Sequence, residues 1–239
     1  MSKTGIKYKR VLLKLTGELF GDSNGKGINF ASFEKIATQL IKIRKSTGIE
    51  LAVVVGGGNI FRGRERASQV DQATADYMGM LGTVINGMAL QEALERKGIP
   101  TRMMTAFEIH AVAEPYIRRR AIRHLEKGRV VILTAGVGSP FFTTDSGAAL
   151  RAIEINCEVI LKATDVDGVF SNDPKKDKKA KFFQKLSYKE AIKKDLKIMD
   201  STAFALCRHQ KMPIIVFNIN KLDQLKKILA GKSIGTLVS

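Results

Sequence analysis

The 239-residue chain has no tryptophan, two cysteines and no apolar run near the ~20 residues that a membrane-spanning helix needs. We therefore expect no membrane span. Cys157 and Cys207 lie far apart and form no CxxC pair, which favours reduced thiols in a reducing compartment, the cytoplasm. The N-terminal segment lacks a long apolar stretch followed by a small-residue cleavage site, so we expect no signal peptide.

Acidic residues are also scarce: 23 Asp and Glu stand against 40 Lys and Arg, which gives a formal net charge of +17. Such a charge attracts nucleic acids, anionic surfaces or phosphorylated small molecules. The basic residues are spread along the chain, however, and aromatic residues make up 7% of it with no alternation of aromatic and basic positions. A dedicated nucleic-acid binder is therefore one alternative and not the first expectation.

Apolar runs alternate with segments of helical periodicity along the chain. We expect strands at 9–17, 49–55, 101–106, 129–136, 157–164 and 213–219. We expect helices at 33–48, 72–97, 114–128, 145–156, near 188–194, near 201–210 and up to about 230. This alternation predicts an α/β fold, a three-layer αβα sandwich around a mainly parallel sheet. No linker divides the chain, so 1–239 is expected to be one domain, and the lysine-rich 171–186 a mobile loop.

Residues that bind phosphate follow several of these strands. Ligands of parallel sheets bind at the carboxyl ends of the strands, here after Leu15, Val55, Leu133 and Leu161. The corresponding loops carry Lys14 and Gly17, Gly56 to Gly58 with Arg62, Asp145, and Lys162. Each has a simpler reading: the glycines turn the chain, Asp145 caps a helix, and Lys162 is structural. Their convergence at one sheet edge favours a shared site.

The chemistry of this set is that of phosphoryl transfer between two phosphorylated ligands. Backbone amides of glycine loops and helix N-termini bind phosphate oxygens, and cationic side chains stabilise a phosphoryl group in transfer. A carboxylate can orient the lysines and hold Mg²⁺ through water, and we assign no protein residue as a direct metal ligand. We predict Lys14, Arg62, Asp145 and Lys162 as catalytic residues. The P-loop and dinucleotide patterns are both broken in this chain, and no histidine has metal-ligand spacing.

Six motifs in one order resemble those of bacterial uridylate (UMP) kinases, which belong to the amino acid kinase superfamily. They are "LLKLTGE", "VVVGGGNIFRG", "ADYMGM", "GSPFFTTDS", "LKATDVDGVF" and "MD" at 199–200. The resemblance runs nearly from end to end. It implies an αβα sandwich, ATP with Mg²⁺ as donor, UMP as acceptor, and the products UDP and ADP in pyrimidine nucleotide biosynthesis.

The resemblance also implies ligand sites and an assembly. The implied ATP site comprises Lys14, Leu15, Thr16, Gly17, Gly58, Arg62, Thr164, Phe170 and Asp173. The implied UMP site comprises Gly57, Asp76, Val137, Gly138, Ser139, Pro140, Phe141, Phe142, Thr143 and Thr144. Activation by GTP is implied at Asp22, Ser23, Asn24, Gly25, Lys26 and Gly27, together with a homohexamer. The acceptor lobe would span about 1–160 and the ATP lobe about 161–239.

Two departures and two rivals remain. Val137 and Ser139 replace residues that are often Thr and Asn in the family, so pyrimidine contacts at Val137 would either be made by the backbone or be weaker. The closest rival is a kinase of a small carboxylate (aspartate, glutamate, acetylglutamate or carbamate); "FRG" and "FFTTDS" favour a nucleotide acceptor by resemblance. The second rival is a nucleic-acid binder on a kinase fold. The residues alone leave UMP and CMP open.

Overall fold

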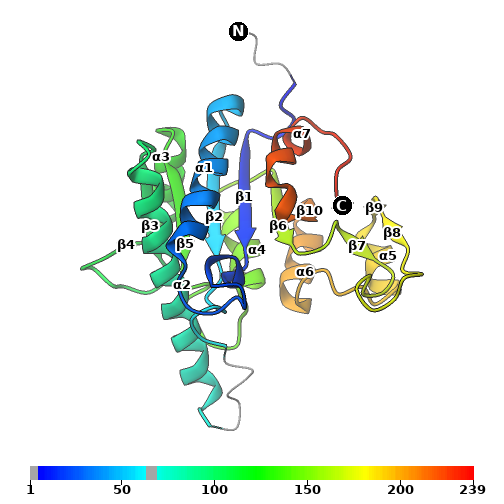
Figure 1. The fold of residues 1–239 in the computed structure, drawn as a ribbon, viewed down its shortest axis with the longest axis horizontal. Coiled ribbons are helices and arrows are strands. Elements are labelled where there is room, and N and C mark those ends of the chain that lie inside the picture. The colour runs from blue at the N-terminus through cyan, green and yellow to red at the C-terminus, as the bar shows by residue number, and fades with distance from the viewer. Residues whose placement is uncertain (1–4, 63–68) are drawn as a thin grey trace.

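The structure, a computed structural model, describes residues 5–62 and 69–239, and its central feature is one large sheet (Figure 1). Within those residues the sheet has nine strands in the order β4-β3-β5-β2-β1-β6-β10-β11-β9, parallel except where β10 meets β11. The strands are β1 Arg10–Leu15, β2 Glu50–Val55, β3 Thr101–Thr105, β4 Glu114–Pro115, β5 Val130–Thr134, β6 Val159–Thr164, β9 Lys185–Leu186, β10 Ile214–Asn218 and β11 Thr236–Val238. A separate antiparallel pair joins β7 Val169–Phe170 to β8 Phe182–Phe183.

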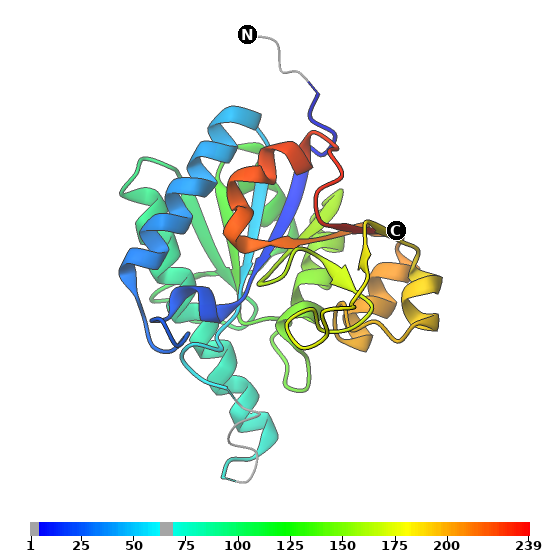
Figure 2. The same cartoon turned by 45° about the vertical axis from the view of Figure 1, so that its right-hand side comes forward.

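Helices cover both faces of this sheet (Figures 1 and 2). They are α1 Phe30–Thr47, α2 Gln72–Glu95, α3 Arg118–Glu126, α4 Thr144–Glu154, α5 Tyr188–Lys193, α6 Ser201–His209 and α7 Leu225–Leu229, with 3-10 helices η1 Gly17–Phe20 and η3 Ile219–Gln224. One core lies between the sheet and α1, α2 and α7. A second lies between the sheet and α3, α4 and α6. The predicted αβα sandwich is confirmed.

The apolar runs of the sequence form strands that are buried on both faces. Along β1 and β2, Leu13 and Val53 face the first core, whereas Leu12, Ala52 and Val54 face the second. Successive side chains of a strand point to opposite faces, so a strand between two helical layers is apolar along most of its length. This explains why no alternation of polar and apolar residues marks these segments.

The predicted helix over 114–128 is wrong at its start. Glu114 and Pro115 form β4 at the edge of the sheet, and α3 begins only at Arg118. An edge strand tolerates proline because a missing backbone N–H leaves no hydrogen bond broken there. Pro115 pairs with Thr105, and the next amide, that of Tyr116, donates to the Thr105 carbonyl at 2.8 Å.

Two more differences lie in the C-terminal half. The expected loop over 171–186 contains strands β8 and β9 at its C-terminal end. The expected final helix consists of η3 followed by the short α7, and the chain then adds β11 antiparallel to β10. The short strands β8, β9 and β11 all pair with residues that are distant from them in the sequence, and local periodicity does not predict such pairing.

Helix α2 extends beyond the end of the sheet (Figure 1). Asp71 caps its first turn by accepting a hydrogen bond from the Thr74 amide. Along one side of the helix, the apolar residues Met78, Leu81, Ile85 and Met88 are each 40 to 46% exposed. Across the described ranges, none of the helices combines the length and apolarity that crossing a membrane requires.

Candidate active site

Two lysines and an aspartate meet at the carboxyl ends of β1 and β6. Lys14 and Lys162 are register partners in these adjacent parallel strands, so their side chains lie on the same face of the sheet. Asp145, in the first turn of α4, contacts both: its Oδ1 lies 3.1 Å from Lys14 Nζ and its Oδ2 2.6 Å from Lys162 Nζ. The three side chains are 10 to 14% exposed. The predicted convergence of these residues is therefore present.

Asp145 does not cap its helix. The cap of α4 is Thr143, whose side chain accepts hydrogen bonds from the amides of Asp145 and Ser146. This leaves the Asp145 carboxylate to face the lysines, and its negative charge is stabilised by the helix N-terminus. Lys162 Nζ also donates to the carbonyl of Ile198 at 2.6 Å, which fixes its ammonium group.

Burial and charge act in opposite directions on this cluster. Burial by itself raises the pKa of Asp145, but the attraction of Lys14 and Lys162 outweighs it and holds that pKa below its usual 3.8. Burial lowers the pKa of Lys162; Asp145 opposes this shift, and Lys14 adds to it. Asp145 is thus an ionised carboxylate at neutral pH that holds two buried ammonium groups near one point.

The glycines of the first two loops allow three backbone segments to come very close together. A Cβ on Gly17 would lie 2.5 Å from the Gly58 nitrogen, and one on Gly56 2.8 Å from the Gly17 nitrogen. A Cβ on Gly57 would lie 2.4 Å from the Gly79 carbonyl oxygen of α2. Such contacts leave no room for a side chain. These glycines bring the loops after β1 and β2 together against α2, and none of Gly56 to Gly58 has a positive φ.

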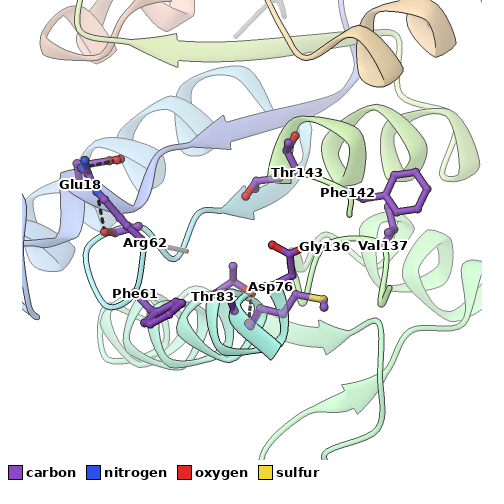
Figure 3. Close-up of a pocket in the computed structure, with 14 residues that line it drawn as sticks. Glu18, Phe61, Arg62, Asp76, Thr83, Gly136, Val137, Phe142 and Thr143 are labelled. Atoms are coloured by element: carbon purple, nitrogen blue, oxygen red, sulfur yellow. Dashed lines mark hydrogen bonds and ion pairs between the residues drawn. The ribbon is translucent and has the colours of Figure 1, made fainter. Parts of the chain in front are cut away.

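A cavity of about 440 Å³ opens between α2, the glycine loops and the start of α4; we call it the first cavity (Figure 3). Asp76, Phe142 and Thr143 line one side of the cavity, and Phe61 lines the other side. Asp76 Oδ2 accepts a hydrogen bond from the Phe141 amide at 2.7 Å, which ties α2 to the loop before α4.

Arg62 lies at the rim of the first cavity. Its Nη2 pairs with Glu18 Oε1 at 2.8 Å, and its Nε donates to the Gly58 carbonyl at 3.1 Å. Because both ionic side chains are more than 40% exposed, this pair contributes little to stability. Its effect is to place a guanidinium, which binds phosphate oxygens well, beside the glycine loop.

A second cavity, of about 640 Å³, is next to Lys162. Lys162 lines it, together with Thr164, Phe170 and Asp173. The rest of its wall comes from the β6–β7 region, from the residues around Ile198, and from Val216 of β10. The Lys14–Asp145–Lys162 cluster adjoins both cavities: Lys162 lines the second, and Asp145 directly follows Thr143 and Thr144, which line the first.

A sequence model of the amino acid kinase family matches residues 9–218. This chain belongs to the amino acid kinase family. The matched region includes both cavities and the lysine–aspartate cluster, and it leaves out only the two ends of the chain.

Solved structures of the family agree along the whole chain. The crystal structure of UMP kinase from Bacillus anthracis is 42% identical with a TM-score of 0.93, covering 97% of this chain and 96% of that one. UMP kinase from Ureaplasma parvum is 35% identical with a TM-score of 0.90, covering 98% and 99%. Uridylate kinase from Archaeoglobus fulgidus is 25% identical with a TM-score of 0.69, covering 96% and 99%. The resemblance to bacterial uridylate kinases is confirmed.

The predicted site residues divide between the cavities. Of the predicted UMP set, Asp76, Val137, Phe142, Thr143 and Thr144 line the first cavity. Of the predicted ATP set, Thr164, Phe170 and Asp173 line the second. Gly58 and Arg62, predicted to contact ATP, line the first cavity and not the second.

Other predicted residues lie beside the cavities. The walls of the two cavities do not include Leu15, Thr16, Gly17, Gly57, Gly138, Ser139, Pro140 or Phe141. Gly57 packs against the backbone of α2 at Gly79, and the backbone amide of Phe141 donates to Asp76, which lines the first cavity. The segment Asp22 to Gly27 lies against the glycine loop: the Gly27 amide donates to the Asn59 carbonyl at 2.8 Å.

Sequence reasoning assigned no role to Glu18 or to Asp200. Glu18 holds Arg62, as described above, and its signal was an acidic residue directly after the glycine turn of β1. Asp200 caps α6 and accepts hydrogen bonds from the hydroxyls of Thr143 and Ser146. It thereby joins α6 to the first turn of α4, which carries Asp145. Asp200 belongs to the "MD" motif at 199–200 and directly precedes a helix start, but neither signal indicated its contacts with α4.

Proposed function

We propose that this protein transfers the γ-phosphoryl group of ATP to UMP and releases UDP and ADP, as a step in pyrimidine nucleotide biosynthesis. The observation that carries the proposal is the buried Lys14–Asp145–Lys162 cluster, which adjoins two separate cavities. One cavity suits the donor nucleotide and one the acceptor, with the cationic cluster where the transferred group must pass. The names of the similar structures, UMP and uridylate kinases, support UMP as the acceptor.

The two cavities support a division into lobes within one domain. All described residues that line the first cavity lie between Glu18 and Thr144, and those of the second between Lys162 and Val216. We therefore propose that about 1–160 forms the acceptor lobe and about 161–239 the ATP lobe. Strands β1 and β6 join the lobes through the continuous sheet.

In the proposed reaction, a phosphate oxygen of UMP attacks the γ-phosphorus of ATP in line. A new P–O bond forms while the bond from the γ-phosphorus to the bridging oxygen breaks, and the electron pair leaves with ADP. Lys14 and Lys162 stabilise the negative charge on the transferred group, and Asp145 keeps their ammonium groups in place. Arg62 restrains phosphate oxygens. A phosphate monoester is already nucleophilic near neutral pH, so no strong general base is needed.

Mg²⁺ is proposed to enter with ATP. Among the described residues there is no group of three or more His, Cys, Asp or Glu side chains that could hold a metal ion. We propose that the ion is carried mainly by phosphate oxygens and water, as Mg²⁺ usually is. Asp145 Oδ1, which lies 3.1 Å from Lys14 Nζ, is our candidate for a water-mediated contact with the ion. The ion would neutralise charge on the phosphates of ATP.

The proposal is tested by measuring ADP release from ATP with UMP, CMP, aspartate, glutamate, acetylglutamate and carbamate as acceptors. We expect turnover with UMP above that with CMP, and none above background with the carboxylates. Turnover with a carboxylate alone would replace the proposal by its closest rival. DNA binding with a steep salt dependence and no ATP turnover would support the nucleic-acid binder instead.

A homohexamer and activation by GTP complete the proposal. The stripe of Met78, Leu81, Ile85 and Met88 on α2 supports a subunit interface, because its 3-4-3 spacing suits packing of one helix against another. The contact of Gly27 with the glycine loop supports a regulatory role for the segment Asp22 to Gly27. Light scattering and rates with added GTP test these two points.

Cys157 and Cys207 are buried free thiols, which agrees with the cytoplasmic location that we propose.

A further inference from the structure

Two asparagine side chains form a buried pair behind the glycine loop. Asn59 follows the three glycines, and Asn86 lies in the middle of α2. They are 4% and 0% exposed. Each amide donates to the other: Asn59 Nδ2 to Asn86 Oδ1 at 3.1 Å, and Asn86 Nδ2 to Asn59 Oδ1 at 2.7 Å.

The remaining hydrogen bonds of the pair reach two further loops. Asn86 Nδ2 donates to the Gly56 carbonyl at 2.7 Å, at the start of the glycine loop. Asn59 Nδ2 donates to the Gly27 carbonyl at 2.7 Å, and the Gly27 amide donates back to the Asn59 carbonyl at 2.8 Å. The pair therefore connects α2, the glycine loop and the segment Asp22 to Gly27.

A buried asparagine at the centre of a helix is unfavourable for the stability of the folded protein. Asparagine is a poorer helix former than leucine or alanine, and a buried amide that is not fully hydrogen-bonded destabilises the folded protein. Apolar side chains of similar volume would fill this space without that requirement. What apolar side chains would not supply is a fixed direction for the Gly56 and Gly27 carbonyls.

We propose that Asn59 and Asn86 are positioning residues that hold the glycine loop for phosphoryl transfer and couple it to the segment Asp22 to Gly27. This inference rests on the proposed function. The Gly56 carbonyl is locked by Asn86, so the peptide plane that precedes Gly57 has one orientation. The Gly79 carbonyl and Gly17 confine the other sides of the loop. A displacement at Gly27 reaches the same loop through Asn59.

The test replaces Asn86 by aspartate, which has the same shape but presents an oxygen to the Gly56 carbonyl and to Asn59. The matched control is Leu94→Ala, a fully buried α2 residue that loses core packing and is not among the cavity-lining residues. We expect Asn86→Asp to lower kcat about 10- to 100-fold with KM for both nucleotides changed less than about threefold, because a slightly misplaced loop costs transition-state stabilisation. Leu94→Ala should keep kcat within about twofold at an equal or larger loss of Tm.

A second measurement does not depend on activity. Asn86→Ala removes the same hydrogen-bond donors but does not place a carboxylate oxygen against the oxygens of Gly56 and Asn59. This variant replaces Asn86→Asp in the test if the aspartate variant does not fold. In this variant, amide hydrogen exchange over residues 22–27 should be at least about fivefold faster than in the wild type, although Asn86 itself does not touch that segment. In Leu94→Ala, exchange there should be unchanged.

The outcomes separate the two proposals. Wild-type protein that does not phosphorylate UMP defeats the proposed function, whereas the exchange result, measured without nucleotide, still reports on the coupling. The positioning role is overturned if folded Asn86→Asp keeps kcat within twofold, or if Leu94→Ala loses as much kcat at the same Tm. Unchanged exchange over 22–27 in Asn86→Ala overturns the coupling.

Discussion

Replacing Asp145 by asparagine removes the carboxylate that contacts both Lys14 and Lys162. The side chain keeps its size, but two ammonium groups that are almost fully buried lose their counter-charge. One face of the new amide carries an N–H group, which points a donor at a donor. The substitution therefore tests the charge arrangement and not the packing of the site.

The expected loss of stability follows from the burial of the cluster. Removing one partner of a buried ion pair typically costs about 3–5 kcal/mol. For a chain of this length each kcal/mol corresponds to about 2 °C, so we expect Tm to fall by about 6 to 10 °C. Because the lysines are no longer held at the transferred group, kcat should fall by about 10² to 10³.

Thermal denaturation at pH 7 and ADP release with UMP measure both effects on the same sample. Asp223→Asn is the control, since Asp223 is an exposed aspartate; it should shift Tm by about 1 °C or less and leave kcat unchanged. In the double variant Asp145→Asn/Lys14→Met, part of the lost Tm should return while kcat stays low. Asp145→Asn with wild-type Tm and kcat would refute the reasoning.

Three further predictions follow from the site. The Tm difference between wild type and Asp145→Asn should shrink as pH falls below 3.8. The lowered pKa of Asp145 stabilises the folded protein above pH 3.8, and this stabilisation is lost when acid protonates the carboxylate in the folded state. A Tm difference that stays constant with pH would contradict the lowered pKa. Gly57→Ala should destabilise the protein strongly, because its Cβ would lie 2.4 Å from the Gly79 carbonyl, whereas Gly79→Ala, with nothing near its Cβ, should gain up to about 1 kcal/mol in denaturant unfolding. Asp76→Ala should raise KM for UMP about tenfold and leave KM for ATP unchanged, since it frees the Phe141 amide; steady-state kinetics with an equal rise in both constants would argue against separate cavities.

The sequence predicted the site where topology alone decides positions. In a parallel sheet all carboxyl ends share one edge, so loops after separate strands must meet there. Lys14 and Lys162 end neighbouring strands in register, which turns two distant lysines into a pair. The contact of the Asp145 carboxylate with both lysines could be expected from the motif. It could not be expected from the position of Asp145 at a helix start, where helix capping is the simpler interpretation.

What the sequence did not predict depends on contacts between distant residues. Asp200 looks like an ordinary helix cap, yet its carboxylate also bonds Thr143 of another helix. Pro115 fits the first turn of a helix as well as an edge strand, and only the neighbouring β3 decides between the two. The buried role of Asn86 is hidden in the same way, because a polar residue within an amphipathic helix normally marks the exposed side.

The central claim is that donor and acceptor occupy two cavities on either side of the lysine pair. A crystal structure with UMP and a non-hydrolysable ATP analogue tests it most directly. We predict the UMP base beside Asp76 and Phe142, the adenine beside Thr164 and Phe170, and the γ-phosphorus between Lys14 and Lys162. Nucleotides bound elsewhere, or a γ-phosphate that neither lysine contacts, would contradict the account.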